Sequence, residues 1–79
     1  MLTPVQVRMA RAALRWSVRE LAQAAGVADS TILRFETERG TILSSNLARI
    51  QETLEEEGVV FLPAAGSEGA GVRSKGSPK

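Results

Sequence analysis

The side chains in this sequence that could take part in chemistry are arginines and carboxylates, because the chain contains neither histidine nor cysteine. Two pairs of acids stand close together, Glu36 with Glu38 and Glu55 with Glu56. We expect them on helix surfaces or in turns, where no cleft would shelter one member for acid–base catalysis. The glycine-rich stretch 66–71 lacks the Lys and Ser/Thr of a phosphate-binding loop. The sequence therefore predicts a protein that is not an enzyme and has no catalytic residues.

The same composition limits cofactors and architecture. A disulfide framework is excluded, and a metal site would have to rest on carboxylates alone, so we expect neither a metal nor another cofactor. With 79 residues the chain makes at most one domain, near the size at which a single core only just suffices. One Trp and two Phe predict a core of Leu, Ile, Val and Ala, as in a compact helical bundle. Neither a signal peptide nor a membrane span is apparent, which predicts a cytoplasmic protein without a membrane partner.

Charge is distributed unevenly along the chain. Residues 1–49 carry seven arginines against four acids, a balance of +3, whereas residues 50–62 carry four glutamates and no base. Residues 63–79 return to a balance of +2, with three bases against one acid. A basic front and an acidic far end suit a protein that presents one side to phosphates. The alternative is that +3 over 49 residues is ordinary surface charge.

The stretch 16–37 predicts two short helices joined by a fixed bend. Ser17 followed by Glu20 is the pattern of a capping box, which starts the first helix. Gly26 ends it, since glycine tolerates the left-handed conformation that stops a helix. The second helix is expected over 29–37. Two helices joined by so short a turn cross steeply, which is helix-turn-helix geometry.

The order S-x-x-E-L-A-x-x-A-G-V-x-x-S-T-I-x-x-F-E over residues 17–36 resembles the Cro and phage-repressor (XRE) family of DNA-binding transcriptional regulators. The likeness extends over residues 3–58, and the later G-V-x-F-x-P and G-V-R resemble a subgroup of small bacterial regulators in this family. The resemblance implies an all-α, lambda-repressor-like fold, with four to five helices around a central helix-turn-helix. A short C-terminal β-strand or hairpin is expected to follow.

The expected elements fill three segments of the chain. We expect a helix-turn-helix domain over 1–58, a β extension over 59–73 and a disordered tail over 74–79. The elements are helices over 4–15, 18–25, 29–37 and 45–57 and strands over 59–63 and 71–74, which form either a hairpin or a pairing with another chain.

Local signals mark most of the helix boundaries. Thr3, Pro4 and Gln6 supply a cap, a first-turn proline and a capping-box partner for the first helix. Gly40 is expected to break the third helix, and Ser44 or Ser45 to cap the fourth. The third helix has Ala28 where the family usually has Ser or Thr. Either Asp29 or Ser30 takes over as its cap, or its first turn frays in the free protein.

The resemblance implies that helix 29–37 lies in the major groove of double-stranded DNA and that its outward side chains contact base edges. These side chains are Asp29, Ser30, Thr31 and Arg34. Arg34 is the first choice, because arginine can bind O6 and N7 of guanine together. Phosphate contacts are expected from flanking residues, namely Ser17, Arg19, Arg39, Thr41 and Ser45. Leu33 also faces outward, toward a thymine methyl, a partner chain or nothing.

Arg11 and Glu36 have a separate, structural role in the family that this chain resembles. There an arginine at this position pairs with the glutamate, which ties the first helix to the third. The alternative for Arg11 is a phosphate contact.

The β extension is expected to make a homodimer. The strand has more apolar side chains than one short strand can bury, namely Val59, Val60, Phe61 and Leu62. Because side chains alternate along a strand, one of its faces is left for a partner. An intramolecular hairpin with residues 71–73 that seals the core of a monomer is the alternative. The sequence as a whole predicts a sequence-specific DNA-binding transcriptional regulator. A protein-binding module, such as an antitoxin or adaptor that binds another regulatory protein through the acidic helix and β tail, is the other possibility.

Overall fold

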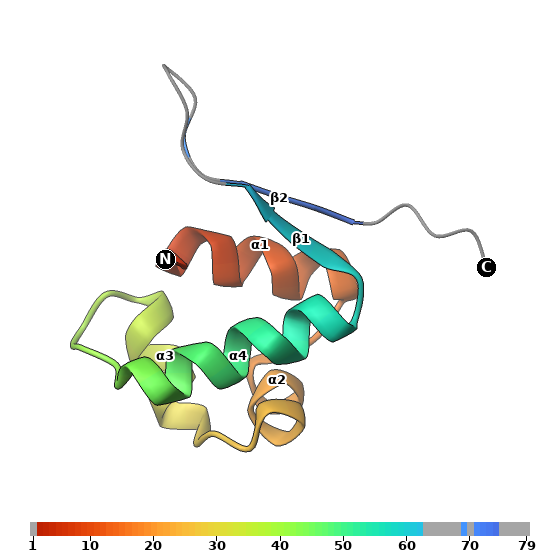
Figure 1. Cartoon of the computed structure of the whole chain (residues 1–79). Helices are drawn as coiled ribbons and strands as arrows, with labels where there is room; N and C mark the ends of the chain where they lie inside the picture. The colour runs from red at the N-terminus through yellow and green to blue at the C-terminus, as the bar shows by residue number, and fades with distance from the viewer. Residues whose placement is uncertain (1, 63–68, 70, 75–79) are drawn as a thin grey trace.

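The computed structural model describes residues 2–62, 69 and 71–74, which form four helices followed by a two-stranded sheet (Figure 1). The elements are α1 (Pro4–Leu14), α2 (Val18–Ala25), α3 (Asp29–Glu36), α4 (Ser44–Glu56), β1 (Val59–Leu62) and β2 (Gly71–Ser74). The predicted fold, a helical bundle with a central helix-turn-helix and a C-terminal β hairpin, is confirmed.

Reciprocal capping boxes start the first two helices, as the sequence predicts. At α1, Thr3 Oγ1 accepts from the Gln6 N–H at 3.1 Å, and Gln6 Oε1 accepts from the Thr3 N–H at 3.0 Å. At α2, Ser17 and Glu20 make the same two bonds at 3.1 and 2.7 Å. Each box satisfies amide groups that would otherwise lack a partner at the helix start.

The other two helices start without such help. The N-cap residues of α3 and α4 are Ala28 and Leu43, which have extended backbone conformations and make no side-chain cap bond. The predicted caps, Asp29 or Ser30 for α3 and Ser44 or Ser45 for α4, are therefore wrong. All four residues lie inside the first turn, where the backbone is already helical.

Three helices, α1, α3 and α4, end one residue earlier than predicted. Arg15 adopts a left-handed conformation, with φ of 59°, so α1 ends at Leu14. After α3 it is Glu38, with φ of 58°, that leaves the helical path, and the expected breaker Gly40 does not have a positive φ. The backbone thus turns two residues earlier than the glycine indicated.

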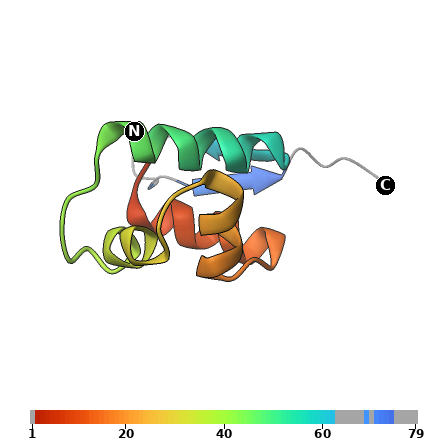
Figure 2. The same ribbon diagram turned by 90° about the horizontal axis from the view of Figure 1, so that it is seen from below.

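The core is aliphatic and lies between the four helices and the sheet. Its buried members are Leu2, Val7, Ala10, Leu21, Ala22, Ala25, Ile32, Leu47, Ile50, Leu54 and Val59. Half-buried Trp16 and Phe35 pack against this cluster. α2 contacts both α3 and α4, while α1 contacts α3, and the view from below shows α2 and α3 side by side (Figure 2).

β1 pairs with β2 of the same chain, in an antiparallel register that joins Phe61 to Val72 and Val60 to Arg73. Phe61 and Val72 pack against the core, so Val60 and the exposed Arg73 lie on the outer face. β1 contacts α4 and β2 contacts α1. β2 includes Ser74, the first residue of the expected tail, and residues 75–79 lie outside the described part of the chain.

A buried glutamine fixes the hairpin to α1. The Gln6 side-chain amide donates to the backbone carbonyls of Leu62 and Gly71, each at 3.0 Å. These two residues form the last pair of the ladder before the connection, and Gln6 is only 3% exposed. One side chain therefore closes the capping box of α1 and holds both strands of the sheet.

Gln6→Ala is expected to lower the free energy of unfolding by about 1 to 3 kcal/mol, because two carbonyls lose their donor and Thr3 loses an acceptor. Gln23→Ala, on an exposed position of α2, is the matched control and should change it by less than about 0.5 kcal/mol. Chemical denaturation of both variants measures the difference. Equal, small losses would show that the Gln6 contacts do not hold the hairpin.

Candidate nucleic-acid interface

The turn between α2 and α3 sets how the second helix emerges from the first. Gly26 has φ of 72°, the left-handed conformation that the sequence predicts for it. The Gly26 and Val27 N–H groups both donate to the Ala22 carbonyl, at 2.9 and 3.0 Å. Ala22 itself is 2% exposed, as expected for a small residue at a close helix crossing. The bend is therefore held by backbone bonds and packing.

α3 has a buried side and an outward surface. Ile32 and Glu36 are buried, whereas Asp29, Ser30 and Arg34 are exposed. Ser30 and Arg34 are four residues apart and share one face of the helix. Thr31, the fourth residue predicted to contact bases, is half-buried and lies at the border of this surface.

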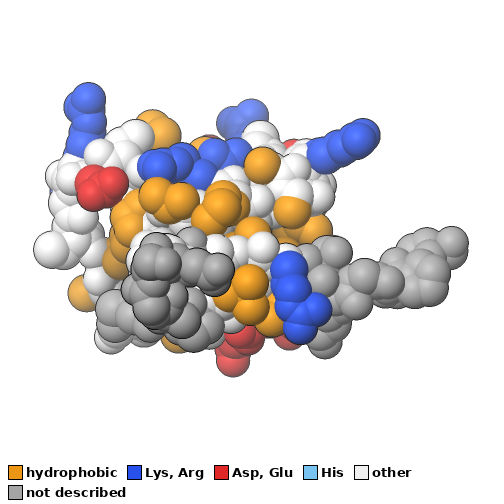
Figure 3. Space-filling model, turned by 90° about the horizontal axis from the view of Figure 1, so that it is seen from above, with side chains coloured by type: hydrophobic (Ala, Val, Ile, Leu, Met, Phe, Trp, Pro, Cys, Tyr) orange, Lys and Arg blue, Asp and Glu red, His pale blue; other side chains and the backbone are white. Residues whose placement is uncertain are grey.

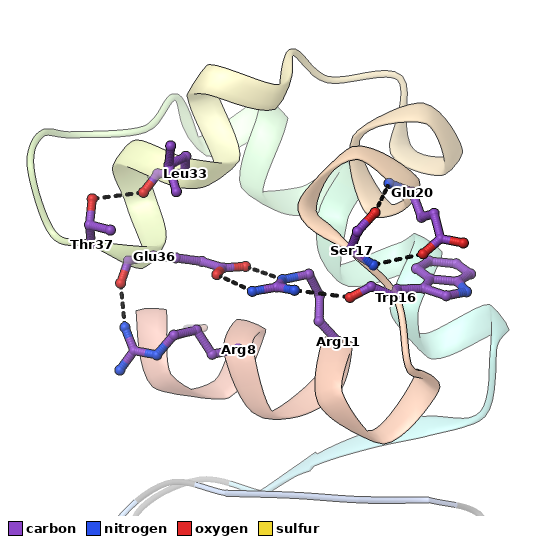
Figure 4. A network of polar contacts seen from close by, with 8 residues as sticks. All are labelled: Arg8, Arg11, Trp16, Ser17, Glu20, Leu33, Glu36 and Thr37. Carbon is purple, nitrogen blue, oxygen red and sulfur yellow. Dashed lines mark hydrogen bonds and ion pairs between the residues drawn. The ribbon is translucent and has the colours of Figure 1, made fainter.

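A buried ion pair fixes the inner side of α3 to α1. Arg11 Nε and Nη2 donate to the two carboxylate oxygens of Glu36, both at 2.7 Å (Figure 4). The Glu36 side chain is 3% exposed and that of Arg11 is 21% exposed. The Arg11 pKa is raised above its ordinary value, chiefly by its hydrogen bonds to Glu36, against an opposing effect of burial. The predicted contact between Arg11 and Glu36 is therefore present in the fold.

Arg11 and a neighbouring arginine extend this pair into a network. Arg11 Nη1 donates to the Trp16 carbonyl at 2.9 Å, which attaches the segment before α2 to the same point. Arg8 donates to the Glu36 backbone carbonyl at the end of α3 (Figure 4). No sequence pattern identifies a partner for Arg8; its position three residues before Arg11 is the one available sign. α3 is thus fixed to α1 through both the carboxylate and the backbone carbonyl of Glu36.

The residues predicted to contact phosphates are all exposed and flank α3 on two sides. Ser17 and Arg19 lie at the start of α2, Arg39 and Thr41 in the turn after α3, and Ser45 in the first turn of α4. Arg19 Nε lies 3.9 Å from Asp29 Oδ2, and both side chains are largely exposed, at 78% and 58%. This contact is long and exposed, so it leaves Arg19 available to another anion.

Arg34 lies against the turn that follows α3. A Cβ atom placed on Gly40 would be 3.1 Å from Arg34 Nη2, so the guanidinium rests beside the Gly40 backbone. The Arg34 carbonyl also accepts from the Arg39 N–H at 2.9 Å. The turn after α3 therefore contacts both the side chain and the backbone of Arg34. This role of Gly40 is not predicted from the sequence, where the glycine indicates only the end of a helix.

The described residues show no sign of a metal site, of an unsatisfied buried polar side chain or of a membrane-spanning helix. Within residues 2–62, 69 and 71–74, no three acidic side chains are grouped so as to hold a metal ion. In the same part of the chain every buried side-chain nitrogen or oxygen has a hydrogen-bond partner. Among these residues, no helix has the length and apolarity that crossing a membrane requires.

Four helices in this order, with a fixed turn between α2 and α3 and an outward surface on α3, define a helix-turn-helix DNA-binding domain. Residues 7–59 match the helix-turn-helix family HTH_3, which is the Cro and C1 repressor type of the XRE family. The chain belongs to this family. Membership implies DNA binding, and the family is typically non-enzymatic. Comparison with curated protein sequences gave no match.

Removing one member of the Arg11–Glu36 pair is expected to destabilise the fold strongly and unequally. Arg11→Met should cost about 3 to 5 kcal/mol, because it leaves the carboxylate of Glu36 buried without its partner. Glu36→Gln should cost less, about 1 to 3 kcal/mol, because Arg11 is partly exposed and can still reach water. Chemical denaturation of both variants and the double mutant measures the coupling.

The exposed Arg19–Asp29 contact supplies the control for this cycle. Asp29→Asn should change the free energy of unfolding by less than about 1 kcal/mol. Small and additive losses for Arg11→Met and Glu36→Gln would mean that the pair does not hold α1 to α3.

Proposed function

We propose that this protein is a sequence-specific transcriptional regulator that places α3 in the major groove of double-stranded DNA. The observation that carries the proposal is the division of α3 into two sides. One side is fixed to α1 through the buried Arg11–Glu36 pair, and the other presents Asp29, Ser30 and Arg34 to solvent. A helix must be held rigidly in this way if its side chains are to select base pairs.

Arg34 is proposed as the main residue that contacts a base. Its guanidinium can donate two parallel hydrogen bonds to O6 and N7 of guanine, a pattern that only this base presents in the major groove. Ser30, on the same face, can donate to or accept from any base edge. Asp29 is expected to accept from a cytosine amino group, since its charge repels phosphate. Thr31 is placed to contact the edge of the groove.

The flanking residues are proposed to position the domain on the phosphates. Ser17 and Arg19 would contact one strand near the start of α2, and Arg39, Thr41 and Ser45 would contact the other beyond the turn. The unused backbone N–H groups in the first turn of α4 favour an anion at the same place. Such contacts confer affinity without sequence preference and weaken as salt rises.

The protein is further proposed to act as a homodimer, because one helix-turn-helix domain contacts only one half-site. It is proposed to act in the cytoplasm. The interface would use the outer face of the hairpin. Val60 lies on this face and Leu62, on the same face, is 38% exposed, while Val59 and Phe61 support it from the core side. Figure 3 shows hydrophobic side chains gathered on the hairpin side of the molecule.

Arg34→Ala is expected to relax the preference at one base pair and to weaken binding to the preferred sequence by about 1 to 3 kcal/mol. Arg39→Ala removes a neighbouring exposed arginine. It should weaken binding to all sequences similarly and reduce the slope of log affinity against log salt concentration by about one. The preferred sequence is first selected from random duplex DNA. Affinities for its single-base variants then separate the two effects. An unchanged preference profile for Arg34→Ala would contradict the assignment of the outward surface.

Leu62→Glu is expected to weaken dimerisation at least about tenfold, since it puts a charge into an apolar contact, with little effect on the fold. Leu43→Glu, at a 70% exposed leucine outside the hairpin, is the matched control and should leave the dimer intact. Sedimentation equilibrium measures both. A wild-type protein that sediments as a monomer, alone and on a single half-site, would refute the dimer.

A further inference from the structure

The outward surface of α3 contains a leucine that the proposed polar contacts do not use. Leu33 is 53% exposed, although it lies in the middle of an eight-residue helix. It follows Ser30 by three residues, so the two side chains are neighbours on the helix surface, and it directly precedes Arg34 in the sequence. The other large hydrophobic side chains that are exposed within the described residues, Val5, Leu43 and Leu62, lie outside α3.

Leu33 and the Thr37 methyl group make one part of this surface apolar. Figure 4 shows the Leu33 side chain directed away from α1 and from the Arg11–Glu36 pair. Thr37 lies one turn further on, and its hydroxyl donates to the Leu33 carbonyl at 2.8 Å. That hydroxyl is therefore satisfied within the helix, which leaves the Thr37 methyl group for contacts outside it. Leu33 and Thr37 are both exposed and four residues apart, so together they offer hydrocarbon on one face of the helix.

We infer that Leu33 packs against the C5-methyl group of a thymine and so selects a T·A pair next to the guanine bound by Arg34. This inference rests on the proposed function. Thymine is the one standard base that presents a methyl group in the major groove, and an apolar side chain selects it by contact alone. Leu33 cannot donate or accept a hydrogen bond, so it has no other means of distinguishing base pairs.

The sequence order of the two side chains adds a geometric constraint. Leu33 and Arg34 are adjacent in α3, so the bases that they contact must be close neighbours in the duplex. The selected operator should therefore place a thymine within a base pair or two of the guanine that Arg34 recognises. Burial of one methyl group corresponds to roughly a fourfold change in affinity.

The experiment compares thymine with deoxyuracil, which differs only by the missing methyl group. The full chain is first used to select a preferred sequence from random duplex DNA. Each thymine of that sequence is then replaced singly by deoxyuracil, and affinities are measured for the wild-type protein, Leu33→Ala and Leu43→Ala. Thermal unfolding of each variant shows whether the fold is kept, as expected for two exposed leucines.

The wild-type protein and Leu43→Ala should lose about fourfold in affinity at one thymine near the guanine, whereas Leu33→Ala should not distinguish thymine from deoxyuracil there. A selected sequence with no deoxyuracil-sensitive position would overturn the inference and leave the proposed function standing. A penalty that persists in Leu33→Ala would assign the methyl contact to another residue and overturn it equally. If no sequence is enriched at all, the proposed function fails and this inference fails with it.

Discussion

The salt bridge between Arg11 and Glu36 is the interaction on which the orientation of α3 depends. A carboxylate that is 97% removed from solvent is tolerated in the core only when its charge is matched and its oxygens are hydrogen-bonded. The two bonds of 2.7 Å from one guanidinium meet both requirements. The planar fork of arginine also fixes the angle between the two helices, which a lysine would not do.

α3 needs this external support because its own stability is low. It has eight residues and no side-chain cap, and helices of this length are not stable alone. Ile32 and Glu36 supply one apolar and one ionic contact on its inner side, and Arg8 binds the carbonyl at its end. The exposed surface of the helix therefore takes its direction from α1 together with the turn after α2. α1 also holds the hairpin through Gln6, so the same helix connects the surface proposed for DNA with the surface proposed for the dimer.

Much of this architecture could be predicted from the sequence, because the determining signals are local. The two capping boxes, the left-handed Gly26 and the three- and four-residue spacing of core residues each act within one or two helical turns. The caps of α3 and α4 could not be predicted, since Ala28 and Leu43 occupy the N-cap positions and carry no capping side chain. The second role of Gln6 spans 56 and 65 residues of sequence, and no local pattern encodes it. For the site, helical spacing placed Asp29, Ser30 and Arg34 on one surface, but the proximity of Gly40 to Arg34 depends on the left-handed Glu38.

Methylation interference on the selected operator tests whether α3 enters the major groove. Dimethyl sulfate methylates guanine at N7 in the major groove and adenine at N3 in the minor groove, so one reaction probes contacts in both grooves. We expect N7 methylation of the guanine proposed to bind Arg34 to block binding, because that nitrogen is one of the two acceptors of the guanidinium. Arg34→Ala should abolish this interference while the phosphate contacts persist. Interference confined to adenine N3, or binding that tolerates N7 methylation at every guanine, would contradict this placement of α3.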